Sequence, residues 1–483
     1  MDESHDFSKW EFHKFEINGR HILYDVNSAQ FFSIDEATYN LLDYIKKYDK
    51  DDLSGIPAGK FPKEDILDTL EELEDYREKG LICIGKPELP DMPDGNETVK
   101  LAPLSKLTIN VANDCNMRCK YCWNHYGTYT GSPKLMDENT AVKAVDFLFN
   151  RSEDSKNLEI DFYGGEPLLN FDILKFCTEY AFKRAETENK KITFSIQTNG
   201  TLLDDGIIEY LEGRNFGIFM SIDGDSMYHD SVRIEKDGTG TWSKVTSAAR
   251  KILDNRRSKI QIRATLTPSN MNLSDTVQYL EKMGFEKVAA EYALELDTKK
   301  DNKKKVFFNS ADRDRQRDEL IRYAMTYLDK ILAGSYSSWF DLEIADVYNN
   351  TSRISSCSVA YGNQIAVDAY GDIYPCVTFT GNKEYLLGNI KDSKLRLDLF
   401  RSLGKRRIDN SKICNECWAK FLCGGACAAL SHWYYGDISV PDNNYCEKKR
   451  HKLEVVIWLI CELQEKAPDF FNNSFKLSQG NRI

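Results

Sequence analysis

The stretch Cys115-Asn116-Met117-Arg118-Cys119-Lys120-Tyr121-Cys122 places three thiols at the spacing C-x3-C-x2-C. An apolar, β-rich run precedes it and ends at Asn113-Asp114, which predicts a loop that leaves a strand. Three soft thiolates on one short loop suit an iron–sulfur cluster or zinc. A structural zinc site normally takes four protein ligands, and the nearest further candidate is His125. Three thiolates on a four-iron cluster instead leave one iron open to a substrate.

With Tyr121 as its aromatic residue, this motif resembles the C-x3-C-x-aromatic-C signature of the radical S-adenosylmethionine (SAM) family. The resemblance implies that Cys115, Cys119 and Cys122 are catalytic and hold a [4Fe–4S] cluster, whose open iron chelates SAM. In that family an electron from the cluster splits the sulfonium and releases a 5′-deoxyadenosyl radical. The protein orients the cofactor and excludes water.

Length and charge limit the possible classes of protein. A chain of 483 residues is too long for one ordinary core, and its net charge of −12 argues against nucleic-acid and membrane partners. The start, Met1 to Asp6, lacks the apolar core of a signal peptide, and the longest apolar run, Val455 to Cys461, is far short of the ~20 residues that span a bilayer. We therefore expect a cytoplasmic protein whose thirteen cysteines do not form disulfides. Ten of them cluster as metal ligands, whereas Cys83, Cys177 and Cys461 are expected to be packed thiols.

Residues 1–95 predict a small separate module. Apolar runs joined at Asn18-Gly19 and Asn27-Ser28 predict three strands, and two helices and a short strand at 81–84 follow. This order resembles the winged-helix-like recognition element of many peptide maturases, in which a leader peptide adds as a strand to the sheet edge. The alternative is a structural cap on the next domain. A linker rich in Pro, Asp and Gly, 86–98, follows the module.

Residues 100–310 alternate short apolar runs with longer helical stretches, the pattern of βα units around a parallel sheet. Strands are predicted at 105–111, 158–163, 191–197, 216–222 and 260–266. Helices are predicted at 137–150, 171–186, 203–212, 242–255 and 273–283. The fold class is therefore α/β, and the order resembles the partial (β/α)6 barrel of the radical SAM family, whose ligands gather at the carboxyl ends of the strands.

Glycines and polar residues follow these predicted strands. Gly164-Gly165-Glu166 comes after the second strand, where the resemblance implies binding of the SAM amino group; without that context the run is an ordinary turn. The polar residues after the third strand suit ribose hydroxyls or the methionyl carboxylate, or cap the next helix. In the peptide-modifying branch that the fourth strand resembles, its serine and Arg233 hold SAM. The predicted SAM-binding residues are Tyr121, Gly164, Gly165, Glu166, Ser195, Gln197, Asn199, Ser221, Asp223 and Arg233.

Seven more cysteines lie between residues 351 and 450, a region that bridging helices at 311–350 connect to the barrel. Zinc could take four of them. The order of spacings instead resembles the SPASM domain, which binds two auxiliary [4Fe–4S] clusters. The resemblance implies one cluster on Cys414, Cys417, Cys423 and Cys446, and another on Cys357, Cys376 and Cys427. A helix and a poorly ordered tail are expected at 451–483.

Two cubane clusters fully bound by cysteine need eight thiolates, and seven are present. Positions 358–375 contain no further cysteine. One iron of the cluster on Cys357, Cys376 and Cys427 is therefore either open to a substrate thiolate or bound by a non-cysteine ligand or water.

The resemblance over most of the chain predicts an enzyme that modifies a ribosomally made precursor peptide bound through its leader. Its three [4Fe–4S] clusters and SAM would draw electrons from an external flavodoxin- or ferredoxin-type donor. The predicted product is a thioether between cysteine and a carbon of another residue, as in maturases of cysteine-rich peptides. Carbon–carbon crosslinking and formylglycine formation in a sulfatase share the scaffold. The alternative from another class is a non-catalytic metal-binding scaffold that recruits a peptide and needs no SAM pocket.

Overall fold

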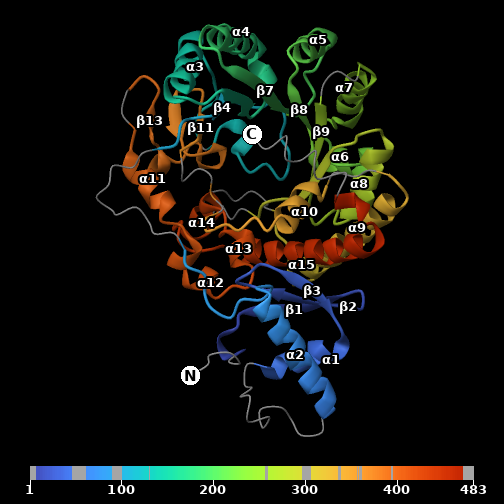
Figure 1. Ribbon diagram of the computed structural model, residues 1–483. Coiled ribbons are helices and arrows are strands. Elements are labelled where there is room, and N and C mark those ends of the chain that lie inside the picture. The colour runs from blue at the N-terminus through green and yellow to red at the C-terminus, as the bar shows by residue number, and fades with distance from the viewer. Residues whose placement is uncertain are drawn as a thin grey trace.

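The computed structural model describes residues 7–45, 61–89, 101–129, 131–255, 259–295, 306–335, 339–355, 357, 362–392 and 395–471. Most of the predicted linker, the highly charged residues 296–305 and nearly all of the tail lie outside these residues. Figure 1 shows a barrel, a cysteine-rich region beside it, and an N-terminal module below one long helix.

A curved sheet forms the barrel, and its strand order is β10-β9-β8-β7-β6-β4-β11-β12-β13, with β5 paired to β4. Strands β10 through β4 run parallel, so the predicted α/β class and partial barrel are confirmed. The barrel strands are β4 (Lys106–Asn113), β6 (Asn157–Gly164), β7 (Lys191–Thr198), β8 (Gly217–Ser221), β9 (Lys259–Leu266) and β10 (Val288–Tyr292). The first five agree with the predicted runs within two residues. The sequence analysis missed β10, whose Val288-Ala289-Ala290 core is short and weakly apolar.

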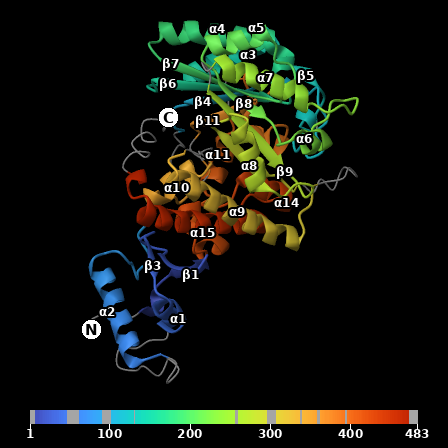
Figure 2. The same ribbon diagram turned by 90° about the vertical axis from the view of Figure 1, so that its right-hand side faces the viewer.

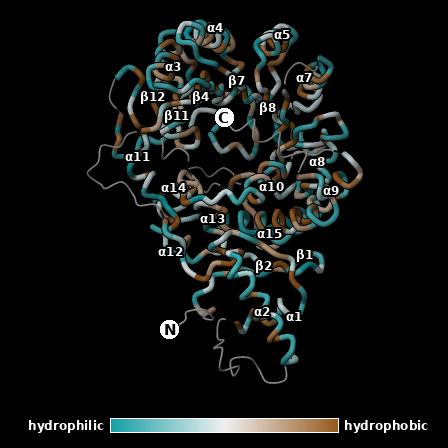
Figure 3. Tube along the Cα trace, viewed as in Figure 1, coloured by the Kyte–Doolittle hydropathy of each residue, from teal (hydrophilic) through white to brown (hydrophobic). Residues whose placement is uncertain are grey.

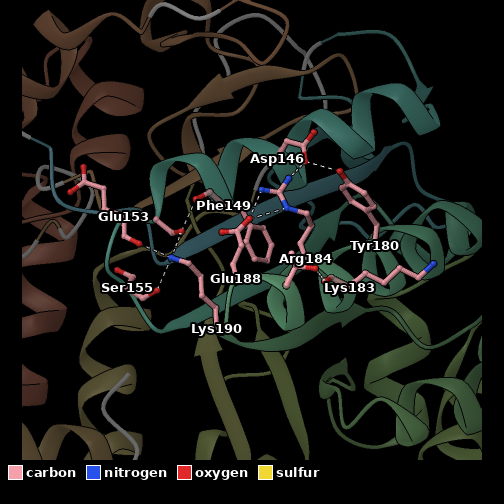
Figure 4. Close-up of polar contacts among 11 residues, drawn as sticks. Asp146, Phe149, Glu153, Ser155, Tyr180, Lys183, Arg184, Glu188 and Lys190 are labelled. Carbon is pink, nitrogen blue, oxygen red and sulfur yellow. Dashed lines mark hydrogen bonds and ion pairs between the residues drawn. The ribbon is translucent and has the colours of Figure 1, made fainter.

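Helices cover the outer face of the sheet, where the apolar strand residues point (Figure 1). They are α3 (Glu138–Arg151), α4 (Phe171–Thr187), α5 (Asp205–Gly213), α6 (Ser226–Val232), α7 (Trp242–Asn255) and α8 (Leu273–Lys282). Figure 4 shows how polar contacts join α3 to α4: Arg184 bridges Asp146 and Glu188, and the Tyr180 hydroxyl donates to Asp146 at 2.8 Å. The outer wall thus adds ion pairs to an apolar interface.

The N-terminal module contains an antiparallel sheet and two helices. The sheet has the order β1-β2-β3, and its elements are β1 (Phe12–Ile17), β2 (Arg20–Asp25), β3 (Phe31–Ile34), α1 (Glu36–Ile45) and α2 (Lys63–Glu78). The predicted strand at 81–84 is wrong: this segment is irregular and pairs with no strand of the described chain. One sheet face packs with α1 and α2 through Leu23 and Phe32, and the other packs toward the main body through Phe15 and Ile22.

Helix α15 (Asn443–Lys466) lies between the barrel and the N-terminal sheet in both ribbon views (Figures 1 and 2). Its residues from Leu453 to Leu463 are all buried, which fits a helix enclosed on every side. Apolar residues colour much of this helix in Figure 3. His13 on β1 bonds Glu454 at 2.9 Å, and Arg20 on β2 bonds Glu462 at 2.6 Å, so charged pairs fix the module to α15. In the part of the chain described, no helix combines the length and apolarity needed to cross a bilayer.

The cysteine-rich region continues the barrel sheet, because β11 pairs in parallel with β4. Its elements are β11 (Gln364–Val367), β12 (Asp372–Tyr374), β13 (Gly388–Asn389), α11 (Leu397–Gly404), α12 (Lys412–Asn415), α13 (Lys420–Cys423) and α14 (Ala428–Tyr435). Helices α9 (Ser310–Leu332) and α10 (Asp341–Tyr348) form the predicted bridge to it. The shared sheet was not predicted, since pairing between distant strands leaves no local signal in the sequence.

Candidate active site

The three-cysteine loop follows β4 and is tied to the segment after α6. The backbone N–H of Arg118 donates to Ile234 O at 2.7 Å, and that of Lys120 donates to Val232 O at 2.9 Å. The Arg118 guanidinium also donates to the carbonyl oxygens of Cys115 and Met117. These bonds hold the loop at the carboxyl edge of the barrel, as the sequence predicted.

The thiols of this loop lie in a shielded environment with N–H donors. Met117 N donates to Cys115 Sγ at 3.4 Å, and Tyr126 N donates to Cys122 Sγ at 3.2 Å. Burial raises the pKa of Cys115 to about 12 and that of Cys119 to about 11, so iron must displace protons when it binds. Within the described residues, no three His, Cys, Asp or Glu side chains surround a single metal ion. A four-iron cluster holds its thiolates farther apart, because each binds a different iron.

Two glycines bring the end of β6 against this loop. An added Cβ on Gly164 would lie 2.3 Å from Ala112 O, and one on Gly165 would lie 2.1 Å from Asp114 O. Gly164 also has φ +129°, a region that favours glycine. On the other side, Gly127 packs on Gly165, where its Cβ would lie 2.4 Å from the Gly165 Cα. Gly164 and Gly165 therefore fix the position of the cysteine loop, in addition to their predicted role of letting the backbone approach SAM closely.

Glu166 lies fully buried beneath the loop, with three hydrogen-bond donors. Its carboxylate accepts from Leu168 N at 3.0 Å, Thr198 Oγ1 at 2.8 Å and Asn199 N at 2.7 Å. Burial raises its pKa to about 7, against the effect of these bonds. We expected its carboxylate to accept from an ammonium. In the structure it joins the ends of β6 and β7, so its observed contacts are those of a positioning residue.

Asn199 links the third strand to the first cysteine. Its Nδ2 donates to Asn116 Oδ1 at 2.9 Å and lies 3.7 Å from Cys115 Sγ, while its Oδ1 accepts from Thr201. Asn116 Nδ2 in turn donates to Thr201 Oγ1 at 2.8 Å. Asn199 was predicted from the sequence, whereas Asn116 and Thr201 were not, although Asn116 lies inside the cysteine motif and Thr201 directly follows Asn199-Gly200.

Tyr121, Asp223 and Arg233 converge in a buried network. The Tyr121 hydroxyl donates to Asp223 Oδ2 at 2.5 Å and accepts from Arg233 Nη1 at 2.5 Å. Asp223 and Arg233 are 0% and 6% exposed, and their charged groups are 3.8 Å apart. Arg233 Nε is buried without a hydrogen-bond partner among the described residues. It is therefore a free donor for an anionic group such as a carboxylate.

His229, which the sequence analysis did not assign, supports this network. Its Nδ1 accepts from the Asp223 backbone N–H at 3.2 Å, and its Nε2 lies 3.0 Å from Thr241 Oγ1. Burial, with the nearby Arg233 charge, lowers the pKa of His229 to about 3. The imidazole is therefore neutral in the folded protein.

This pKa predicts a pH-dependent stability. An unfolded histidine binds a proton below about pH 6.5 whereas folded His229 does not, so its contribution is complete above pH 6.5 and is lost as the pH falls toward 3. At pH 5 we expect a loss of about 2 kcal/mol of unfolding free energy from this residue. Thermal melts of the reconstituted protein at pH 7 and pH 5 should therefore differ less for His229→Gln than for wild type. A His21→Gln control should keep the wild-type difference; equal differences in all three proteins would contradict the assignment.

Three other residues predicted to bind SAM, Ser195, Gln197 and Ser221, make no hydrogen bond to the cysteine loop among the described residues. Ser195 Oγ donates to Asp161 Oδ1 at 2.8 Å, deeper in the barrel, and Gln197 Oε1 lies 3.5 Å from Arg263 Nη1. Ser221 ends β8 and is half-buried. Their roles in SAM binding remain predictions. Asp161 and Arg263, which were not predicted, give the barrel interior a charged lining.

The seven cysteines between Cys357 and Cys446 gather into two sets. Cys427 and Cys357 lie close enough to Cys376 for their charges to raise its pKa, and all three pack against one small apolar cluster. The neighbours of Cys446 are Cys423, Cys414 and Cys417. Burial raises the pKa of Cys376 to about 11 and that of Cys446 to about 12. The structure thus brings the seven together as three and four, the division implied by the resemblance, and their roles as ligands remain predictions.

Comparisons with known proteins match two parts of the chain. Residues 109–280 match the radical SAM superfamily, and residues 357–418 match the SPASM iron–sulfur cluster-binding domain. The radical SAM cyclopropyl synthase TigE of Paramaledivibacter caminithermalis is 24% identical, with 86% of this chain and 87% of that protein covered. The cysteine-type anaerobic sulfatase-maturating enzyme of Clostridium novyi is 26% identical, with 71% and 92% covered. The solved structure of histidine-tagged anSMEcpe with bound AdoMet has a TM-score of 0.65 at 22% identity, covering 77% of this chain and 98% of that one.

The chain therefore contains a radical SAM domain at residues 109–280 and a SPASM domain at residues 357–418, and it shares its fold with the solved structure. These domains imply a SAM-binding [4Fe–4S] cluster and auxiliary clusters. The donor sets fit such groups: shielded thiols occur in three sets, N–H groups point at sulfur, and a buried Arg233 Nε lacks a partner among the described residues.

Proposed function

We propose that this protein modifies a ribosomally synthesised peptide by forming a thioether between a cysteine sulfur and a carbon of another residue. SAM bound at the cysteine loop would supply a carbon-centred radical that removes hydrogen from the peptide. The observation that carries the proposal is the combination of this loop with the two further cysteine sets in a region whose strand β11 pairs with β4 of the barrel. Relatives support a peptide substrate, since one solved neighbour is anSMEcpe with bound AdoMet and Cp18Cys peptide.

The chain's own residues would perform distinct tasks in this reaction. Arg233, fixed by Asp223, would bind the SAM carboxylate through its free Nε, and Asn199 would hold the Cys115 sulfur. The set of Cys357, Cys376 and Cys427 supplies one thiolate fewer than a four-iron cluster has irons, so a substrate cysteine can complete it. Electrons would come from an external flavodoxin- or ferredoxin-type protein.

The direct test is mass spectrometry of a candidate cysteine-rich peptide after anaerobic incubation with the reconstituted protein, SAM and a reductant. We expect a loss of about two hydrogens per crosslink and one thiol fewer for alkylation, because each thioether consumes one S–H and one C–H. Release of 5′-deoxyadenosine with an unchanged peptide would leave the radical chemistry standing and reject that peptide as substrate. No deoxyadenosine with any peptide would contradict the enzyme proposal itself.

Formylglycine formation is the second candidate, favoured by the sulfatase-maturating relatives. It would give an aldehyde that reacts with a hydrazide, whereas a thioether would not. The N-terminal module counts against it. The alignment with TigE covers 86% of this chain, so it must include part of residues 1–95. The alignment with the sulfatase-maturating enzyme of Clostridium novyi leaves more than a quarter of the chain uncovered, which is enough to leave the module out.

The edge of β3 is the proposed leader-binding surface. Asp25 N donates to Gln30 O, and with the register Leu23↔Phe32 this places the backbone groups of Phe31 and Ser33 on the side away from β2. Among the described residues, β3 pairs with no strand except β2, and Ser33 is exposed. An extended peptide could therefore add to this edge.

Ser33→Pro tests this edge because it removes an outward N–H without breaking the ladder to β2. Loss of one backbone hydrogen bond is expected to weaken peptide binding about three- to tenfold. Ser33→Ala is the matched control, since it removes only the hydroxyl that accepts from Arg20. Isothermal titration calorimetry measures the effect, with the unmodified precursor of a peptide that the protein has been shown to modify. Equal affinities of the two variants for this peptide would contradict strand addition at β3.

A further inference from the structure

A pocket of about 100 Å³ lies where β10, α9 and α15 meet, outside the cysteine sites. Figure 2 shows α9 and α15 side by side below the barrel strands. Residues Glu291 and Tyr292 bring the carboxyl end of β10 into the pocket, and Trp339 forms an aromatic wall. The volume suits a side chain with its flanking backbone rather than a nucleotide cofactor.

Gln316 lines this pocket and has no partner in the described structure. It is 6% exposed, yet neither its Oε1 nor its Nε2 has a hydrogen-bond partner among the described residues. Buried carboxamides are almost always bonded, because each unpaired polar atom carries a desolvation cost. A carboxamide can donate and accept at once, as a backbone peptide group requires. Gln316 is therefore complementary to a peptide backbone.

The charges around the pocket favour an anion. Its cationic side chains are Arg313, Arg317, Lys448 and Lys452, against the acidic Glu291 and Glu447, while burial lowers the pKa of His451 below its usual value. Lys452 pairs with Glu343 at 2.5 Å, but within the described residues Lys448 has no carboxylate within ion-pair distance and lies over the Phe308 ring at 5.1 Å. Lys448 is half-buried, and an ammonium without a carboxylate within ion-pair distance gains more from an incoming anion than an already paired one does.

The pocket also lies beside α15, the helix that packs against the N-terminal sheet. Its α15 residues, from Glu447 to Lys452, precede Glu454, which bonds His13 of the N-terminal sheet. Its β10 residues include the carboxyl end of that strand, and the cysteine loop follows the carboxyl end of β4, which runs parallel to β10 in the same sheet. A peptide that extended from the module to the barrel could therefore pass it.

We propose that this pocket binds an acidic side chain of the peptide substrate, with Lys448 facing the carboxylate and Gln316 bonding the adjacent backbone group. It rests on the proposed peptide-modifying function, but it can be tested by binding alone. The probe is a fluorescein-labelled peptide that has two glutamates flanked by glycines, compared with the same peptide carrying glutamines. Anaerobic fluorescence anisotropy with the reconstituted full-length protein, without SAM, measures affinity separately from catalysis.

We expect the glutamate peptide to bind at least tenfold more tightly than the glutamine peptide, with a difference that shrinks in high salt. Gln316→Leu and Lys448→Met should each weaken its binding about tenfold, whereas Lys251→Met, which removes an exposed charge on α7, should not. Gln316→Leu should also melt at the same or a higher temperature, because it removes two unpaired buried atoms. Equal binding of the two peptides, or full affinity in Gln316→Leu, would overturn the proposal. Tight acidic binding without any peptide modification would uphold the pocket and reject the proposed function.

Discussion

Cys115→Ala is expected to lower the release of 5′-deoxyadenosine by a thousandfold or more, on the order of complete loss. Cys115 is a buried residue of its loop and the one whose sulfur Asn199 contacts. Two remaining thiolates cannot hold a four-iron cluster in the geometry that leaves one iron for SAM. Anaerobic reconstitution followed by chromatography of the nucleoside product measures the effect.

Cys177→Ala is the matched control for this loss. Cys177 is also a fully buried thiol, but it lies in α4 within the apolar core, far in the sequence from each cysteine set. We expect normal deoxyadenosine release and a stability loss of about 1 kcal/mol. If Cys115→Ala kept more than a tenth of the wild-type rate, the loop would not be the SAM-binding site.

Gly165→Ala is expected to reduce the same activity about a hundredfold or more. Its Cβ would lie 2.1 Å from Asp114 O and 2.9 Å from the Gly127 Cα, and these backbone atoms cannot move without shifting the start of the cysteine loop. Displacements near 1 Å at a reacting centre cost about a hundredfold in rate. We also expect about four irons per chain to be lost, because the loop holds one of the three clusters.

Gly213→Ala is the control for this substitution, since nothing lies within 4 Å of an added Cβ there. That residue ends α5, where alanine favours the helix more than glycine does. Activity and iron content should be unchanged. A Gly165→Ala protein with wild-type iron content and rate would show that the close packing between β6 and the loop does not position the cluster.

The sequence predicted the barrel well, because βα repetition and the cysteine spacings are local signals. Five strands and their helices appear where the apolar runs lie, and the cysteines gather into the three sets that the family resemblance implied. Strand β10 escaped, because its run Val288-Ala289-Ala290 carries little apolar signal. The pairing of β11 with β4 joins residues more than 250 positions apart, which no periodicity can reveal.

Side-chain roles at the site were harder to predict than its location. Glu166 accepts from Leu168, Thr198 and Asn199, contacts that its place in the sequence did not reveal, and its role toward SAM stays a prediction. His229 was missed, since its role depends on the fold bringing its Nδ1 to the Asp223 backbone. Composition and spacing identify the kinds of donor atoms, while their partners depend on tertiary packing.

Iron and zinc content of the anaerobically reconstituted full-length protein tests the central claim most directly. Ten cysteines arranged as three sets predict about twelve irons and no stoichiometric zinc per chain. Replacing Cys115, Cys119 and Cys122 together by alanine should lower the count to about eight, since the other two sets remain. One or two zinc ions per chain in place of iron, or an iron count that the triple substitution leaves unchanged, would contradict it.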